Sequence, residues 1–306
     1  GILAIARCNP KETRENIRQI RQMTDKPFGI NQILVGPGAK ENIAVAIEEK
    51  VPIINYSLGK PWFVNDVHAY GGKVVGTIAI AKHAAKAVQL GCDALIITGH
   101  EAAAHGAAAT SMVLIPLVAS MVKVPLIAAG GFYDGRGLAA ALALGADGIS
   151  MGSRFMVVKE SMVHENFKRL CIEATEQDTL YDNVFDGMDG RVLKTKEAEA
   201  MMKRGFPLVD ALMVKNLMNL SFAKFVGVSI EMLRAEEGHP LMVLARQAVG
   251  NMKHLKALND GDVEGGILFA GQCCGGITDN PTTKELIDRI IREADEALAK
   301  LSGYKA

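Results

Sequence analysis

Residues 93–155 repeat one pattern that few folds can accommodate: a short apolar run, a turn rich in glycine, and a helix. Two of the apolar runs, 94–98 and 125–129, have the length and composition of strands buried on both faces. A third run, 148–151, is shorter and of mixed polarity. Strand, turn and helix in unbroken succession are typical of parallel βα units, so the pattern favours a parallel α/β fold.

The same alternation extends back to the start of the chain. Apolar strands are expected at 1–7, 27–32, 51–56 and 73–80, which together with the three above gives seven strands. A TIM or (β/α)8 barrel needs eight strands. We therefore expect this α/β barrel with its first βα unit lost before residue 1, since the chain opens directly on a strand.

The βα alternation stops after residue 156. We expect the barrel over 1–156, a mostly helical insertion that caps its mouth over 157–280, and a C-terminal helix returning to the barrel over 281–306. Within the insertion, 180–192 has the composition of turns with a short extended piece.

Composition and charge exclude several classes of partner. Lys+Arg and Asp+Glu are equal at 34 each, which gives no support for binding to nucleic acid or an anionic membrane. No apolar run reaches the roughly 20 residues of a membrane span, and no signal peptide is visible. Five cysteines, an odd number whose spacing fits no zinc pattern, favour a reducing, cytoplasmic compartment and no metal site.

Glycines follow the last two strands of the repeated region. Glycine lets the backbone approach a ligand closely, and the first N–H groups of the next helix are donors to anions. In a (β/α)8 barrel a phosphate site frequently lies after the seventh and eighth strands. We therefore expect Gly130, Gly131, Gly152 and Ser153 to hold a phosphorylated cofactor, with ordinary tight turns as the alternative.

Three motifs occur in a fixed order: GHEAAAH from Gly99, IAAGGFYDGRG from Ile127 and SMGSRF from Ser150. Upstream, FGIN ends the strand at Asn31, and FAGQ occurs near the C-terminus at Gln272. Together these segments resemble the flavin-dependent nitronate monooxygenases, formerly 2-nitropropane dioxygenases, and their relatives the flavin-dependent enoyl-acyl-carrier-protein reductases. The resemblance covers most of the chain, with the insertion least similar.

The resemblance implies an FMN-binding barrel in which His105 is the catalytic residue. His100 is the competing histidine and fills a variable position of the motif, and Glu101 is expected to anchor the loop. The further cofactor-binding positions that the resemblance implies are Asn31, Thr98, Ala103, Ser150 and Met151. The family's double glycine before the histidine is Ala103-Ala104 here, and the position often occupied by Gln is Thr98.

The function implied is oxidation of an alkyl nitronate with O₂, with His105 taking a proton from carbon. The alternative is NAD(P)H-dependent reduction of an enoyl compound by the same cofactor. An enzyme of the IMP dehydrogenase type shares GADG and MGS before Phe, but it requires a cysteine in the loop where this chain has Ala and His. A flavin-free scaffold or binding protein is a third class. If the protein is an enzyme, its partners are a small-molecule substrate and O₂ or NAD(P)H. The sequence is compatible with a homodimer.

Overall fold

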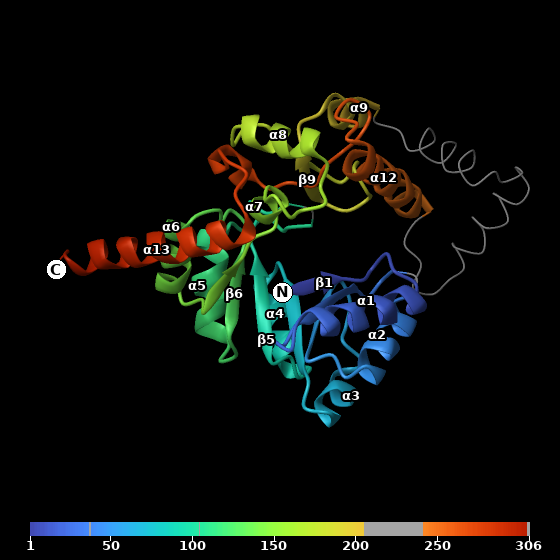
Figure 1. Cartoon of the computed structure of the whole chain (residues 1–306), viewed down its shortest axis with the longest axis vertical. Helices are drawn as coiled ribbons and strands as arrows, with labels where there is room; N and C mark the ends of the chain where they lie inside the picture. The colour runs from blue at the N-terminus through green and yellow to red at the C-terminus, as the bar shows by residue number, and fades with distance from the viewer. Residues whose placement is uncertain (37, 104, 205–240, 305–306) are drawn as a thin grey trace, which may run out of the picture. The chain divides into compact units, whose positions relative to one another are not determined.

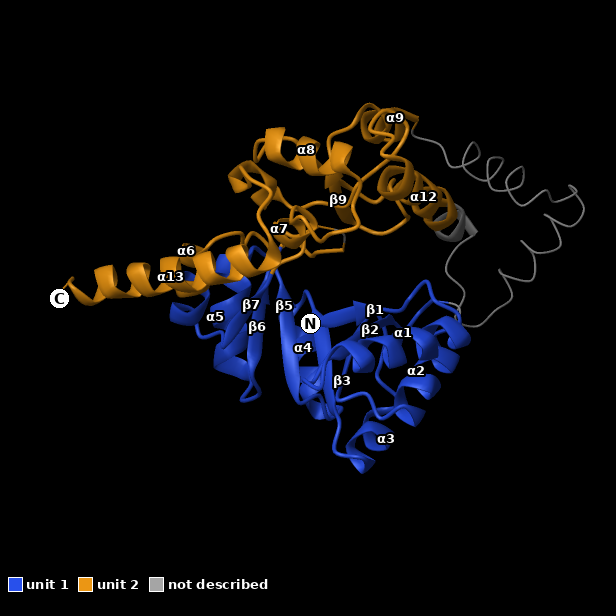
Figure 2. Ribbon diagram, in the orientation of Figure 1, with its two compact units in different colours: residues 1–99, 109–129, 140–150 blue, residues 100–108, 130–139, 151–306 orange. Residues whose placement is uncertain are grey.

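The computed structural model describes the whole chain except residues 37, 104, 205–240 and 305–306 (Figure 1). The helices expected in part of the insertion therefore lie outside the described residues. The chain divides into two compact units, which are coloured separately in Figure 2. Unit 1 comprises 1–99, 109–129 and 140–150, and unit 2 comprises 100–108, 130–139 and 151–306.

Unit 1 contains one sheet of seven parallel strands, and their order in the sheet is their order along the chain. The strands are β1 (Ile2–Ala4), β2 (Gly29–Ile33), β3 (Ile53–Ser57), β4 (Lys73–Ile78), β5 (Ala94–Thr98), β6 (Leu126–Ala129) and β7 (Gly148–Ser150). Each strand pairs with the next in parallel register. Sequential parallel strands alternating with helices are the arrangement of a (β/α) barrel. The predicted fold class and its seven strands are confirmed.

Helices connect these strands. They are α1 (Pro10–Met23), α2 (Ala39–Glu48), α3 (Val64–Ala69), α4 (Ala81–Gln89), α5 (Ser111–Met121) and α6 (Gly135–Ala143). The start of α1 shows why the chain turns helical there. The side chain of Asn9 accepts from the N–H of Glu12 over 3.0 Å, and the Glu12 carboxylate accepts from the N–H of Asn9 over 2.8 Å. This capping box, with Pro10 in the first turn, satisfies N–H groups that a helix start leaves unpaired.

The strands read as apolar runs because the sheet is buried. Ile30, Ile54, Leu95 and Ile97, on β2, β3 and β5, are at most 1% exposed. A strand covered on both faces has no need of alternating polar residues, which is the pattern of parallel sheets. A polar side chain inside such a strand is therefore informative, and Asn55 of β3 is one at 3% exposed.

In the residues that the structure describes, unit 2 is mostly helical and holds one small sheet. Its remaining elements are α7 (Ser153–Met156), α8 (Glu165–Glu173), β8 (Thr179–Asp182), β9 (Gly190–Leu193), α9 (Lys196–Arg204), α12 (Leu241–Asp260), η1 (Gln272–Gly276) and α13 (Thr283–Ser302). Strands β8 and β9 pair antiparallel as a hairpin. The expectation of turns over 180–192 was thus incomplete, because Gly190 and several acidic residues mask the strand pattern. The expected domain limits at 156 and 280 stay a prediction.

The C-terminal helix α13 packs within unit 2. Leu286 and Ile290 form a buried cluster with Val158. Gly135 is required at the crossing with α6, because a Cβ there would lie 2.3 Å from the carbonyl oxygen of Ile290. The N–H of Gly135 donates to the carboxylate of Glu293 over 2.9 Å, which fixes the start of α6 against α13.

The five cysteines are free thiols. Four of them are buried and Cys8 is half-buried, so they contribute to packing rather than to cross-links. Among the described helices, none combines the length and the apolar character that crossing a membrane requires.

Candidate active site

His105 lies in the loop 100–108 of unit 2 and pairs with a buried carboxylate. Its Nε2 is 2.8 Å from Oδ2 of Asp186, in the turn between β8 and β9. Asp186 is 8% exposed. Because an ionised carboxylate can only accept, Nε2 is the protonated nitrogen of the neutral ring, and Nδ1 carries the lone pair that a substrate proton could meet.

The Asp186 carboxylate binds a proton more readily in this environment than an exposed carboxylate does in water. Burial raises the pKa of Asp186, while the electrostatic interaction with His105 and the N–H of Met188 lower it, and the net shift is upward. The Met188 N–H donates to Oδ1 over 3.2 Å. A buried carboxylate of raised pKa held against an imidazole is the kind of perturbed pair that concentrates at functional sites.

Apolar and aromatic groups border this pair. The ring of Phe269 lies 6.2 Å from the His105 imidazole and 5.2 Å from that of His254 on α12, centroid to centroid. His254 Nδ1 is 3.3 Å from the carbonyl oxygen of Ile267. Phe269 thus provides an aromatic neighbour for both imidazoles.

The competing histidine is engaged in holding the loop. His100 Nδ1 lies 2.9 Å from the carbonyl oxygen of Ala107, and its ring packs on Tyr181 with centroids 4.4 Å apart. A side chain with both contacts is suited to support, which leaves His105 as the stronger catalytic candidate.

The turn after β6 has a left-handed backbone at both of its glycines. Gly130 and Gly131 have φ of 97° and 84°, in the left-handed region that favours glycine. A Cβ on Gly131 would lie 3.4 Å from that of Glu101, so this turn lies against the loop 100–108.

The second glycine turn is connected to the same loop through residues 271–272. The hydroxyl of Ser153, 4% exposed, accepts from the N–H of Gly271 over 2.8 Å. Gln272 donates its N–H to the carbonyl of Glu101 over 3.0 Å. A Cβ on Gly271 would lie 2.7 Å from that carbonyl oxygen and 3.2 Å from the N of Ala103. The structure thus brings Ser153, Ala103 and the Gly131 turn to one region of unit 2.

Three predicted residues belong to unit 1. Thr98 and Ser150 are the last residues of β5 and β7, and Asn31 is in the middle of β2. Asn31 donates through Nδ2 to Oδ1 of Asn55 over 2.5 Å, and Asn55 donates to Oγ1 of Thr77 over 3.0 Å. The network extends across three neighbouring strands. Asn55 and Thr77 were not predicted, although the polar Asn55 inside an apolar strand was a usable signal.

Met151 and Gly152, two of the predicted cofactor-binding residues, follow β7 directly. The side chain of Met151 packs on the cluster of Val158 and Ile290, which favours contact with a cofactor through its backbone. Gly152 precedes α7, and a Cβ there would meet no atom within 4 Å, so open space borders its backbone. Ala104 lies outside the described residues.

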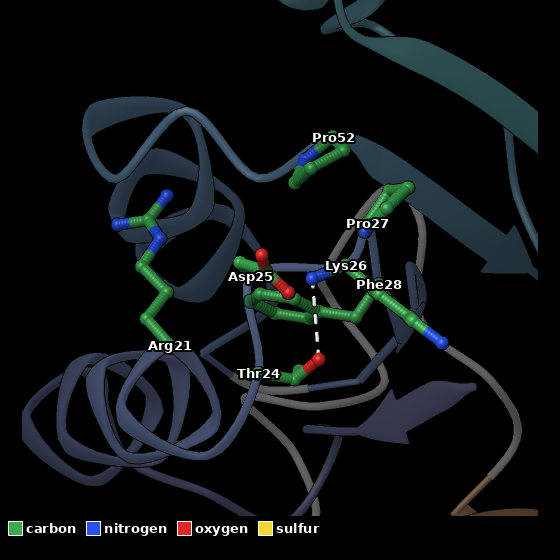
Figure 3. A pocket seen from close by; sticks show the side chains of 7 residues that line it. All are labelled: Arg21, Thr24, Asp25, Lys26, Pro27, Phe28 and Pro52. Atoms are coloured by element: carbon green, nitrogen blue, oxygen red, sulfur yellow. Dashed lines mark hydrogen bonds between the residues drawn. The ribbon is translucent and has the colours of Figure 1, made fainter.

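A groove of about 440 Å³ lies elsewhere in unit 1 (Figure 3). Its walls include Phe28 and Pro52, which immediately precede β2 and β3. Active sites of (β/α) barrels lie at the carboxyl ends of the strands. A groove at their amino ends is therefore not a candidate for catalysis.

Comparisons with known proteins give matches that cover most or all of the chain. The family model "Nitronate monooxygenase" matches residues 32–293. The chain is 34% identical to the (3aS,4S,5R,7aS)-5-hydroxy-7a-methyl-1-oxo-octahydro-1H-indene-4-carboxyl-CoA dehydrogenase of Rhodococcus jostii, over 100% of this chain and 88% of the relative. A probable nitronate monooxygenase of Bacillus subtilis is 30% identical over 65% of this chain and 70% of the relative. The solved structure of FabK from Thermotoga maritima superposes with a TM-score of 0.83 at 34% identity, over 100% of this chain and 88% of FabK.

Proposed function

Since the chain belongs to the nitronate monooxygenase family, a family of flavin-dependent oxidoreductases, we propose that it is an FMN-dependent enzyme acting on the Cα–Cβ bond of an acyl thioester. The observation that carries the chemistry is the His105–Asp186 pair, which can exchange a proton with an acidic carbon. The thioester class is supported by the similarity to a CoA dehydrogenase over the full chain, whereas the nitronate monooxygenase relative matches 65% of it.

The glycine turns of unit 2 fit the phosphate of FMN. Gly130 and Gly131 adopt a conformation that a residue with a Cβ rarely takes, and open space borders the backbone at Gly152. The hydroxyl of Ser153 accepts from the N–H of Gly271 and still has its own hydrogen to donate, so Ser153 could meet the phosphate through its N–H and its hydroxyl. Asn31 and Thr98 remain the predicted partners of the flavin ring edge.

His105 supplies the proton transfer. In the oxidative direction, Nδ1 accepts the proton from Cα of the thioester, while Asp186 stabilises the imidazolium that forms. When bound, FMN would accept the hydride from Cβ, so that two electrons and two hydrogens leave the substrate and a Cα=Cβ bond forms. In the reductive direction His105 would return the proton to Cα, and NAD(P)H would supply the two electrons that reduce the flavin.

Nitronate oxidation with O₂ is the second candidate. It is favoured by the match of the family model over 32–293 and by the nitronate monooxygenase relative. The same imidazole could hydrogen-bond the oxygens of the nitronate, or remove the carbon proton of the parent nitroalkane to form it.

The test is an absorbance spectrum followed by anaerobic titration. Purified protein should be yellow or bind added FMN. A saturated acyl-CoA should bleach the flavin in the oxidative direction. In the reductive direction, NADH should bleach the flavin and an enoyl-CoA added afterwards should restore its colour. Bleaching by an alkyl nitronate alone would replace the thioester by the second candidate, and protein that binds no FMN would refute both. The variant His105→Ala should keep its flavin and lose about 10²–10⁴-fold in turnover rate.

A further inference from the structure

The hairpin of β8 and β9 contacts the loop 100–108 at both of its ends. Tyr181 on β8 donates its hydroxyl hydrogen to the backbone carbonyl of Gly106 over 3.0 Å. Arg191 on β9 donates from Nη2 to the backbone carbonyl of His100 over 3.2 Å. Tyr181 and Arg191 are directly opposite each other in the hairpin, so one cross-strand pair contacts both ends of the loop that carries the imidazole.

Packing alone does not explain Arg191. It is 4% exposed, its terminal nitrogens donate to the neutral oxygens of Thr179 and His100, and its Nε has no hydrogen-bond partner among the described residues. Burial lowers the pKa of Arg191, opposed by the electrostatic attraction of Tyr181 and Glu101. Replacing a buried charge by an apolar residue of similar volume is often neutral or stabilising. The residue is therefore better explained by what it holds than by the stability it adds.

The ring of Tyr181 adds a second set of contacts. Its centroid lies 5.2 Å from Cζ of Arg191 and 4.4 Å from the centroid of His100. Both distances are within the range of favourable aromatic and cation–π contacts. The hydroxyl and the ring thus contact different parts of the loop, and a phenylalanine would keep the ring contacts while removing only the hydrogen bond.

The loop depends on such outside support. Its described residues have no regular secondary structure, and its sequence, HEAAAHGAA, is rich in alanine and glycine. Small side chains bury little apolar surface, and backbone carbonyls outside helices and sheets must find other donors. A misplacement of about 1 Å in a reacting group can cost about 10²-fold in rate, so the conformation of this loop matters for His105.

We propose that Tyr181 and Arg191 are positioning residues, which hold the two ends of the loop 100–108 so that His105 stays hydrogen-bonded to Asp186. The effect on the loop follows from the contacts alone. Its consequence for turnover rests on the proposed function.

The test compares two tyrosine variants by amide hydrogen exchange in the whole, flavin-free protein. Tyr181→Phe should speed exchange in peptides covering 100–108 by about threefold to tenfold, the effect of losing one hydrogen bond on a local opening. The matched control is Tyr70→Phe, because Tyr70 donates a comparable bond to the carbonyl of Val51 over 2.9 Å. This control should leave exchange at 100–108 unchanged.

A spectroscopic measurement addresses the imidazole itself. In ¹⁵N spectra of labelled wild-type protein, His105 should show a single tautomer protonated at Nε2. In Tyr181→Phe and in Arg191→Lys, which keeps the charge but loses the planar fork, its nitrogen shifts should move toward a mixture of tautomers. A merely structural role would lower thermal stability and leave these shifts in place.

The outcomes separate this proposal from the proposed function. If loop exchange and the His105 shifts in Tyr181→Phe equal those of wild type and Tyr70→Phe, the positioning role is refuted, whatever the activity. If Arg191→Lys does not fold, Tyr181→Phe still decides. Protein that binds no FMN would defeat the enzymatic assignment and leave the loop result standing. With an active enzyme, Tyr181→Phe should lower kcat about tenfold and leave the Kd for FMN unchanged.

Discussion

Replacing Asp186 with Asn would remove the negative charge of the His105–Asp186 pair and move the proton of the imidazole, while keeping the shape of the side chain. In the wild type, Asp186 accepts from Nε2 of His105, and Nδ1 is the basic nitrogen. An Asn that keeps its oxygen toward the N–H of Met188 must point its NH₂ group at Nε2. Nε2 then accepts, the neutral ring carries its proton on Nδ1, and the base is lost. We expect kcat to fall about 10²–10⁴-fold, the usual contribution of general acid–base catalysis.

The same variant should not lose stability near neutral pH. Burial raises the pKa of Asp186, so the folded protein holds this proton at a higher pH than the unfolded chain does. The group's contribution to the free energy of unfolding is then full below the unfolded pKa, and it is lost as pH rises through the folded value. An amide at Asp186 carries no charge to bury. The free energy of unfolding near pH 7 should therefore equal or exceed that of wild type.

Asp93→Asn provides a matched control in unit 1. His68 Nε2 and Asp93 Oδ2 are also 2.8 Å apart. Burial pushes the pKa of Asp93 upward, but hydrogen bonds from Lys73, the Val74 N–H and His68 outweigh it, and the net shift is downward. Its stabilising effect is present above the unfolded pKa and is lost as pH falls. The control should therefore lower the free energy of unfolding near neutral pH and leave kcat unchanged.

The assay combines urea unfolding over a pH series with steady-state turnover of whichever substrate reduces the flavin. The two variants should give opposite results, Asp186→Asn losing rate and Asp93→Asn losing stability. Wild-type turnover in Asp186→Asn would show that His105 does not act as a base oriented by this carboxylate. A loss of stability in Asp186→Asn as large as in the control would show that its charge is compensated better than its burial indicates.

Three glycine substitutions test the surroundings of the loop 100–108 and the turn after β6. Gly250→Ala places a Cβ 2.1 Å from the carbonyl oxygen of Phe185, so α12 must shift, and urea unfolding should show a loss of about 1–3 kcal/mol. Gly271→Ala places a Cβ 2.7 Å from the carbonyl oxygen of Glu101, and should speed amide exchange in the loop 100–108. Gly131→Ala meets only ordinary contacts at 3.4 Å but must keep a φ of 84°, at a cost of about 1–2 kcal/mol, and should weaken FMN binding in a fluorescence titration.

Local features of the sequence were sufficient to predict the strands of the sheet and the glycine turns. The buried strands β2, β3 and β5 are apolar because both faces are covered, and this is visible in any short window. The positive φ at Gly130 and Gly131 depends on the residue type, so the turn after β6 could be anticipated. These features depend on neighbours along the chain and not on distant partners.

The partner of His105 could not be predicted in this way. Asp186 is 81 residues further along and lies in a turn whose acidic and glycine residues give no sign of burial. Arg191 poses the same difficulty, since a charged residue in a short strand is usually exposed, whereas this one is 4% exposed. Whether a polar side chain is buried depends on which segments meet in three dimensions, and periodicity in one segment does not contain that information.

The residues around His105 come from two parts of the chain, so the chemistry and the substrate preference could vary independently. The motif that carries His105 follows a strand of the repeated βα units, but the groups that orient it, Asp186, Tyr181 and Arg191, belong to a hairpin outside them. Exchange of the hairpin and its neighbours would alter the surroundings of the imidazole without altering the sheet. We accordingly expect substrate preference to follow unit 2.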